Sequence, residues 1–281
     1  MMRATEITRA WTRSHQVVSP GRNADKHDRG VVLVIGGSRS VPGAAILAGM
    51  GALRTGAGVL QFAVPTRIAI PVGLAMPESL VASMPRRQGA APKQARDADA
   101  VVVGCGMSAA AASGRLVRSL VKALHADATL VVDAAAIDVL REDPEILLPL
   151  GGRAVITPHA GEMASVLDLE KEEIEREPRR VAQHAAERFQ CVVALKGPET
   201  WIASPGGALY RYRGGGIGLG TSGSGDVLAG VVAGFAARGC SAEMGAAWGV
   251  WAHGEAGRRL ARRVGRMGFM AREIADAVRA S

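Results

Sequence analysis

The sequence feature with the clearest chemical meaning is a glycine-rich segment over residues 214–230, GGGIGLGTSGSGDVLAG. It leads into an apolar, alanine-rich stretch, 226–237, that is typical of a buried helix. Such a loop points successive backbone N–H groups at an anion, and the helix dipole adds attraction for phosphate. Asp226 falls in the first helical turn, where it can accept a proton from a hydroxyl that attacks a phosphoryl group. The same position also suits a carboxylate that only caps the helix or stabilises its dipole.

Further candidate chemistry follows short apolar runs that are typical of strands. The runs are 31–37, 59–64, 100–104, 130–134, 154–157 and 192–197. Ligands of a parallel sheet bind outside the carboxyl ends of its strands, so the residues after each run are the ones to inspect. They are Gly36-Gly37-Ser38, Gly104-Cys105-Gly106, Asp133, residues 157–162 and Lys196-Gly197. Each group alone is compatible with an ordinary turn, but all five at one sheet edge predict a site.

The elements that position these residues are those of a doubly wound α/β fold. Because the runs are apolar on both faces, they predict a mainly parallel sheet that is covered by helices on both sides. Residues 201–213 have the pattern of a hairpin, which predicts an antiparallel edge to the sheet. The chain is expected to be helical from residue 225 onward. A charged run over 170–180 is expected to be solvated surface, and Pro178 within it is expected to begin the helix that follows. Residues 86–97 are expected to form an exposed loop.

Composition excludes several classes of protein. Of the 281 residues, 21% are charged, and the 36 glycines have no three-residue period, so neither a disordered polyelectrolyte nor a collagen-like fibre fits. The three cysteines are far apart and lack paired spacing, which argues against a disulfide framework or a zinc site and favours a reducing cytoplasm. No apolar stretch reaches the ~20 residues of a membrane span, and no signal peptide is recognisable.

The net charge of +8 is concentrated near the C-terminus, where residues 258–281 contain seven arginines. Interleaved apolar residues predict amphipathic helices with a solvated arginine face. A nucleic-acid-binding stripe is the alternative, and the absence of stacking aromatics and of known nucleic-acid motifs weighs against it.

Five motifs, in this order and spacing, closely resemble those of the NAD(P)H-hydrate dehydratases, which are members of the ribokinase-like superfamily. They are VLVIGGSRSVPGAAILAGMGALRTGAG, VVDAAAID, TPHAGEM, VALKGPETWIA and GTSGSGDVLAG. The resemblance implies one ribokinase-like domain over residues 26–281 behind an N-terminal extension, 1–25. It also implies an enzyme that uses ADP, or ATP in some members, to restore NADH or NADPH from the S epimer of its hydrate. The reaction that the resemblance implies phosphorylates the ring hydroxyl and then eliminates phosphate.

The resemblance assigns roles to the matching residues. It implies that Asp226 activates the hydroxyl and that Gly223, Ser224 and Gly225 form the anion hole for the transferred phosphoryl group. The residues that match the family's nucleotide-binding segment are Lys196, Gly197, Pro198, Glu199 and Thr200. The resemblance implies that Gly225 also contacts the nucleotide. Contacts to the hydrated dinucleotide match Ala44, Gly106 and His159, together with Asp226.

Magnesium is expected because a nucleoside diphosphate needs charge neutralisation during phosphoryl transfer. Glu162 follows His159 at the spacing of the superfamily's NxxE element, so we expect it to organise Mg²⁺ through water. Taken alone, His159 also suits an ordinary turn, and Glu162 suits a first-turn helix carboxylate.

The chain departs from the common family pattern in three places, which leave the substrate contacts and the role of Asp133 open. Many members have NPGMATGG over residues 216–223, DAD over 133–135 and GPG over 104–106. The third change introduces Cys105, which we expect to fill space rather than to act as a redox thiol.

Two alternative functions remain. A small-molecule alcohol kinase of the same superfamily would use the same anion hole and Asp226. A non-catalytic nucleotide- or nucleic-acid-binding protein would use the basic C-terminal helices, but the intact Asp226 weighs against it. Residues 1–25 are too few for the epimerase domain that is often fused to family members, so a separate epimerase is the expected functional partner. A homo-oligomer without nucleic-acid or membrane partners is also expected.

Overall fold

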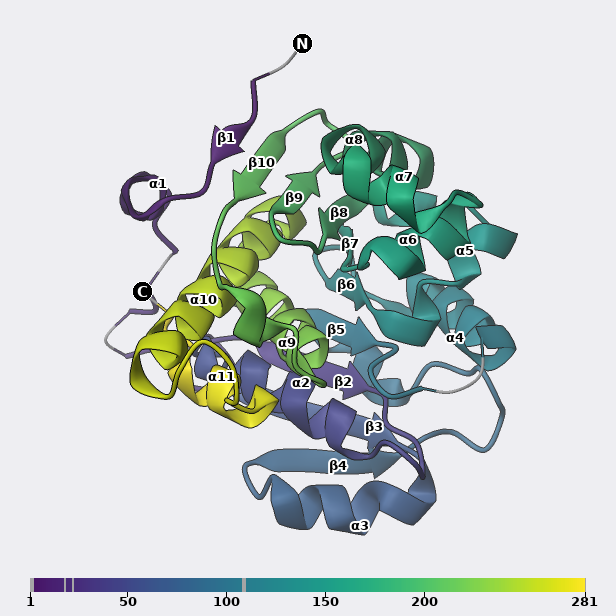
Figure 1. Cartoon of the computed structure of the whole chain (residues 1–281). Coiled ribbons are helices and arrows are strands. Elements are labelled where there is room, and N and C mark those ends of the chain that lie inside the picture. Colours follow the sequence, from purple (N-terminus) through teal and green to yellow (C-terminus); the bar gives the residue numbers. More distant parts are fainter. Residues whose placement is uncertain (1–2, 18, 22, 108–109, 281) are drawn as a thin grey trace.

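The structure is a computed structural model that describes residues 3–17, 19–21, 23–107 and 110–280, and its centre is one ten-stranded sheet (Figure 1). The strands are β1 Thr5–Glu6, β2 Val31–Ile35, β3 Val59–Val64, β4 Ser79–Ser83, β5 Ala100–Val103, β6 Thr129–Val132, β7 Ala154–Ile156, β8 Val192–Leu195, β9 Thr200–Ala203 and β10 Leu209–Tyr212. Their order across the sheet is β1-β10-β9-β8-β7-β6-β5-β2-β3-β4.

The six predicted apolar runs form the central strands, and all neighbours from β8 through β7, β6, β5, β2 and β3 to β4 are parallel. The predicted hairpin is β9 and β10, which pair antiparallel, and β9 is also antiparallel to β8. Two strands were not predicted: β4 at one edge, and the short β1, which adds in parallel outside the hairpin. The hairpin is therefore next to the edge of the sheet.

Helices cover both faces of the sheet. One face carries α2 Gly43–Arg54, α3 Thr66–Ala75, α9 Ser224–Ala237, α10 Ala242–Arg263 and α11 Ala271–Ala277, with α1 Arg9–Ser14 beside them. The other face carries α4 Ala110–Ala123, α5 Val139–Glu142, α6 Ala160–Leu167, α7 Lys171–Arg176 and α8 Pro178–Phe189. Four short 3₁₀ turns complete the described elements, at Lys93–Arg96, Ala134–Ala136, Leu148–Leu150 and Ile217–Leu219.

Strand β2 shows why the runs are apolar throughout. Val32 and Val34 point into the core under α2 and α9, whereas Leu33 and Ile35 point into the core under α4 to α8. All four are essentially inaccessible to solvent. A strand that is buried on both faces needs no polar residue, so its sequence reads as a continuous apolar run.

Helices α2 and α9 meet at backbone distance because small residues line both sides of the contact. A Cβ built on Gly51 would lie 2.5 Å from the Val227 carbonyl oxygen, and one built on Gly230 would overlap the carbonyl oxygen of Ala48. Since the glycines leave no room for side chains, this contact fixes how closely the two helices pack.

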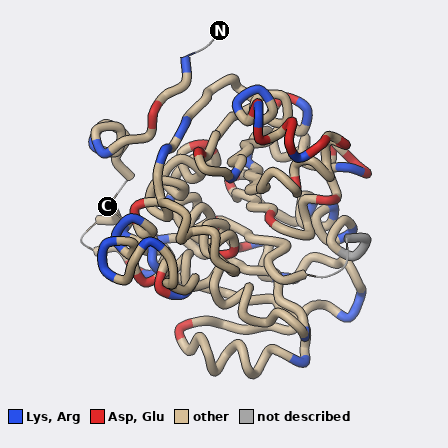
Figure 2. The backbone as a smooth tube through the Cα atoms, viewed as in Figure 1, with Lys and Arg blue, Asp and Glu red and all other residues tan. Residues whose placement is uncertain are grey.

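The charged segments lie on the surface (Figure 2). The C-terminal arginines gather on α10 and α11, where Arg259 donates to the carbonyl oxygen of Ala277 and Arg258 to that of Arg213. Pro178 is the first residue of α8, as predicted. The expected loop over 86–97 includes one 3₁₀ turn that buries Ala95. Within the described ranges, no helix combines the length and apolarity that a membrane span requires.

Candidate active site

The loops that follow the parallel strands converge at one edge of the sheet. The turn after β2 is joined to the turn after β5, because Gly37 N–H donates to the Cys105 carbonyl oxygen over 2.7 Å. The residues after β7 and β8 pair in the same way: Lys196 N–H donates to the Pro158 carbonyl oxygen over 2.8 Å, and His159 and Lys196 form an isolated parallel bridge. Residues predicted from separate strand ends are therefore neighbours in space.

A buried carboxylate, Asp133, links three of these strand ends. It accepts a 2.6 Å hydrogen bond from the Thr157 hydroxyl and a 3.2 Å bond from Lys196 Nζ, both at Oδ1. Its other oxygen lies 3.8 Å from Cys105 Sγ. One oxygen or sulfur atom from each of Cys105, Asp133 and Asp226 lies within 4.8 Å of the others. Two carboxylates are thus crowded into a largely buried space.

The crowding changes the proton affinity of Asp226. Burial raises the pKa of Asp226 to about 6, and the negative charge of Asp133 adds to this rise. A hydrogen bond from Cys105 and the charge of Lys196 act in the opposite direction. The Cys105 thiol is fully buried, and burial together with the carboxylates of Asp133 and Asp226 raises its pKa far above the usual range. It therefore stays protonated and inert, which agrees with its expected space-filling role.

Lys196 connects this cluster to Glu162. Its Nζ lies 3.2 Å from Asp133 and 3.7 Å from Glu162 Oε2. Burial alone would lower the pKa of Lys196, but the two carboxylates outweigh it, so the pKa is raised and the side chain is a permanent cation. A Cβ built on Gly225 would lie 3.3 Å from Lys196 Nζ, which places this cation at the start of α9.

Glu162 and His159 form a reciprocal capping box at the start of α6. His159 Nδ1 accepts from the Glu162 N–H over 3.1 Å, and Glu162 Oε2 accepts from the His159 N–H over 2.8 Å. Both residues therefore have the helix-capping role that the sequence allowed. Glu162 can also bind a ligand, because its carboxylate keeps free acceptor sites and its side chain is 21% exposed.

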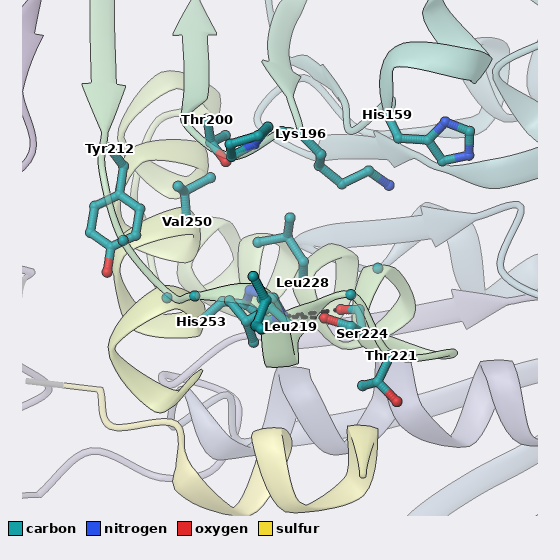
Figure 3. A pocket seen from close by; sticks show the side chains of 18 residues that line it. His159, Lys196, Thr200, Tyr212, Leu219, Thr221, Ser224, Leu228, Val250 and His253 are labelled. Carbon is teal, nitrogen blue, oxygen red and sulfur yellow. Dashed lines mark hydrogen bonds between the residues drawn. The ribbon is translucent and has the colours of Figure 1, made fainter. Parts of the chain in front are cut away.

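A cavity of about 660 Å³ opens over the first turn of α9 (Figure 3). Lys196, Thr200 and His159 lie on the side of the cavity nearest the strands, and Thr221 and Ser224 lie on the opposite side. Its apolar lining comes from Leu219, Leu228 and Val250. A cavity that combines an apolar wall with a few polar groups and a cation suits an anionic ligand with a flat, apolar portion.

The amino-terminal turn of α9 offers hydrogen-bond donors to this cavity. In the described part of the chain, the backbone N–H groups of Gly225 and Asp226 have no hydrogen-bond partner. The Ser224 N–H, in contrast, donates to the Thr221 carbonyl oxygen over 3.1 Å. Gly223 takes a left-handed conformation, φ +86°, that turns the chain into the helix. Free N–H groups at the positive end of a 14-residue helix are suited to bind an anion.

His253 is a functional candidate that sequence reasoning missed. It lies on α10, lines the cavity, and its Nε2 lies 3.1 Å from both the hydroxyl and the carbonyl oxygen of Ser224. Only 7% of the residue is exposed, and burial lowers its pKa to about 4, so the ring is neutral. The sole sequence signal was a polar residue within an otherwise apolar face of a helix.

Apart from Gly223 and Glu162, described above, the predicted site residues fall into four groups. His159, Lys196, Gly197, Pro198, Thr200, Ser224 and Gly225 line the cavity. Asp226 lies in the carboxylate cluster beside it, while Ala44 and Gly106 adjoin each other, since a Cβ on Gly106 would lie 2.7 Å from that of Ala44. Glu199 does not line this cavity; it pairs with Arg213 at 2.9 Å and Arg211 at 3.6 Å.

Comparison with known proteins gives consistent matches. A profile of the NAD(P)H-hydrate dehydratase family matches residues 32–279. The chain is 45% identical over 280 residues to the ADP-dependent (S)-NAD(P)H-hydrate dehydratase of Xanthomonas campestris pv. campestris, covering 97% of this chain and 94% of that protein.

Two solved structures share the fold. The ADP/ATP-dependent NAD(P)H-hydrate dehydratase of Bacillus subtilis, co-crystallised with ATP and Mg²⁺, matches with a TM-score of 0.85 at 23% identity, covering 99% of this chain and 97% of that chain. A ribokinase-like superfamily protein of Enterococcus faecalis matches with a TM-score of 0.82 at 21% identity, covering 98% and 93%. These likenesses confirm the predicted ribokinase-like α/β fold.

Proposed function

This chain belongs to the NAD(P)H-hydrate dehydratase family, and from that premise we propose that it repairs hydrated NADH or NADPH in an ADP-dependent dehydration of the S epimer. The observation that carries the proposal is the position of Asp226. Its carboxyl group has a raised pKa, and it follows directly after Gly225, which lines the cavity and whose N–H group has no hydrogen-bond partner among the described residues. A base beside a phosphate site is what phosphorylation of a hydroxyl requires.

The first step is phosphoryl transfer. ADP would occupy the 660 Å³ cavity, with its base against Leu228 and Val250 and its terminal phosphate near Lys196 and the N–H group of Gly225. Asp226 accepts the proton of the ring hydroxyl, whose oxygen then bonds to the terminal phosphorus, and the bond to AMP breaks. Donors that are already in place stabilise the charge that develops on the phosphoryl oxygens.

The second step is elimination. The bond between the ring carbon and the phosphate oxygen breaks, the neighbouring ring carbon loses a proton, and the ring double bond of the reduced nicotinamide forms again. The hydrated ring would lie between Asp226 and the paired positions Ala44 and Gly106, with His159 at the border of the nucleotide cavity. Because α2 and α9 meet at backbone distance, the substrate contacts and the base are held at a fixed separation.

Magnesium fits this site through Glu162. Mg²⁺ in nucleotide sites is usually held by one or two carboxylates together with phosphates and water, and Glu162 offers a partly exposed carboxylate next to Lys196. When bound there through water, the ion would neutralise phosphate charge. The cluster of Cys105, Asp133 and Asp226 suits Mg²⁺ less, because the thiol is protonated and Asp133 is already neutralised by Lys196.

The direct test supplies hydrated NADH or NADPH with ADP and Mg²⁺ and follows the return of the reduced-nicotinamide absorbance. Repeating the assay with ATP establishes the preferred nucleotide. We expect recovery of absorbance together with stoichiometric release of AMP and phosphate. Accumulation of a phosphorylated hydrate without recovery would instead favour the alcohol-kinase alternative, and no reaction with either nucleotide would remove the proposal.

The pH dependence of the reaction should show one acid limb that belongs to Asp226. Only the ionised carboxylate can accept the hydroxyl proton, and its pKa is raised to about 6, so kcat/KM should rise as the pH increases through about 6. Asp133→Asn removes a neighbouring negative charge that raises this pKa and should move the limb to lower pH. A limb that stays in place in Asp133→Asn would contradict the assigned electrostatics.

The role of Glu162 is tested by Glu162→Gln. Glutamine keeps an oxygen acceptor for the His159 N–H, so the capping box survives, but the negative charge is lost. We expect the Mg²⁺ concentration for half-maximal activity to rise by about 10-fold or more. Glu175→Gln, which neutralises an exposed carboxylate on α7, serves as the control and should leave it unchanged. Equal Mg²⁺ dependence in the two variants would exclude Glu162 from metal binding.

The cellular setting is part of the same proposal. A repair enzyme for a soluble dinucleotide would act in the cytoplasm, together with a separate epimerase that converts the R hydrate to the S form. We also propose that the chain forms a homo-oligomer and uses no nucleic-acid partner. Sedimentation and a DNA titration at two salt concentrations test these last two points.

A further inference from the structure

The contact between His253 and Ser224 fixes which atom carries the hydrogen. A carbonyl oxygen can only accept a hydrogen bond, and His253 Nε2 lies 3.1 Å from the Ser224 carbonyl oxygen. Nε2 must therefore carry the hydrogen. The ring is neutral because burial lowers its pKa to about 4, so Nδ1 is unprotonated and the tautomer is defined.

The same tautomer sets the direction of the bond to the Ser224 hydroxyl. Nε2 also lies 3.1 Å from Ser224 Oγ, and since Nε2 carries the hydrogen, Oγ is the acceptor there. Among the described residues, Oγ has no other hydrogen-bond partner. The hydroxyl keeps its own hydrogen, which is free to point into the cavity that Ser224 lines (Figure 3).

The backbone of Ser224 makes this hydroxyl the only donor that the residue can offer. Its N–H group is occupied by the Thr221 carbonyl oxygen at 3.1 Å, in the turn that precedes α9. The next two N–H groups, of Gly225 and Asp226, are free in the described chain. The Ser224 hydroxyl would therefore supply, at the start of the helix, the donor that the occupied Ser224 N–H cannot.

We propose that His253 is a positioning residue that holds the Ser224 hydroxyl as a hydrogen-bond donor to the phosphoryl group in the cavity. The inference rests on the proposed function, because a phosphoryl group is the anion that the cavity would receive. His253 itself does not touch that group; it acts by occupying the hydroxyl lone pair and the carbonyl oxygen that would otherwise attract the hydroxyl hydrogen. The donor is thereby set in place before the negative charge on the phosphoryl oxygens develops.

A double-mutant cycle tests the proposal, with Ser224→Ala and His253→Leu as the single variants. Ser224→Ala should lower kcat about 100-fold, the loss typical of one donor at a developing charge, with little change in KM for the hydrate. His253→Leu should lower kcat about 10-fold. In the Ser224→Ala background, His253→Leu should cause no further loss, because its effect passes through a hydroxyl that is already absent. His253→Gln keeps an N–H donor near the position of Nε2 and should recover most of the activity.

The controls distinguish positioning of the Ser224 hydroxyl by His253 from a role of His253 in core packing alone. Ser204→Ala removes a hydroxyl from a similarly buried serine in the turn between β9 and β10 and should leave kcat unchanged. If His253→Leu lowers kcat equally with and without the Ser224 hydroxyl, His253 only supports the fold, and the proposal is overturned. Circular dichroism and melting temperature confirm that each variant is folded.

A binding measurement distinguishes failure of this inference from failure of the proposed function. ADP and adenosine are titrated against the wild type and Ser224→Ala, because only ADP carries phosphates. Ser224→Ala should weaken ADP binding about 10-fold and leave adenosine binding unchanged. That pattern in a protein without dehydratase activity would remove the proposed function and retain the donor role. Unchanged ADP binding and unchanged kcat in Ser224→Ala would overturn the donor role in an active dehydratase.

Discussion

Asp226→Asn should reduce kcat for dehydration by about 10³-fold, which lies within the range for removal of a general base. Asparagine keeps the size and shape of the side chain but cannot accept the hydroxyl proton. Nucleotide binding should survive, because the cavity, the N–H group of Gly225 and Lys196 are unchanged. Steady-state kinetics and an ADP titration of the same preparation measure the two effects. A variant with more than one-tenth of wild-type activity would remove Asp226 from the mechanism.

The same substitution should stabilise the folded protein, so a loss of activity could not be explained by unfolding of the variant. The pKa of Asp226 is raised to about 6 from an ordinary value of 3.8, so its favourable contribution to folding is complete below about pH 3.8 and is lost as the pH rises through about 6. At neutral pH the ionised carboxyl costs up to about 3 kcal/mol. Asparagine avoids that cost, so the melting temperature of Asp226→Asn at pH 8 should be higher than that of the wild type. Asp276→Asn, at an exposed ion pair with Arg54, serves as the surface control for both measurements.

Gly230→Ala should strongly destabilise the folded protein. A methyl group at this position would overlap the carbonyl oxygen of Ala48, and backbone cannot move aside as a flexible side chain would. We expect a loss of about 3 kcal/mol or more, and a melting temperature lower by roughly 10 °C. Because α2 would be displaced from α9, kcat should fall as well.

Gly73→Ala provides the matched comparison for Gly230→Ala. Gly73 is also inside a helix, α3, but a Cβ there would lie at an ordinary 3.6 Å from Val81 Cγ2. Alanine is a better helix former than glycine, so this variant should be unchanged or up to about 1 kcal/mol more stable. Equal melting temperatures for the two variants would mean that the contact between α2 and α9 adapts more easily than its geometry indicates.

The sequence was most informative about the central strands. Strands such as β2 and β6 are buried on both faces, and this leaves an uninterrupted apolar run that few other structures produce. Strand β4 escaped prediction because it lies at the sheet edge, where two serines and the exposed Leu80 are tolerated. The two-residue β1 is too short for any periodicity. It is defined only by its partner, β10.

The candidate site was predictable in part, for a physical reason. Asp226 and Lys196 stand beside glycines at strand and helix ends, where local sequence determines the backbone geometry. The pairing of Asp133 with Lys196 and that of Ser224 with His253 join residues 63 and 29 positions apart. Contacts of that kind depend on how elements pack, which a single sequence does not specify.

The N-terminal segment has an unusual place in the fold. Thr5 pairs with Tyr210, Trp11 packs against Tyr210 and Trp248, and the Trp248 indole N–H donates to the His15 carbonyl oxygen over 2.7 Å. Ribosomes make a chain from its N-terminus, so this segment is completed about 200 residues before its partners leave the ribosome. Trp11, only 5% exposed in the finished fold, therefore has no partner surface to pack on until Tyr210 and Trp248 have been made. This segment is therefore made well before the strand and helix on which it packs.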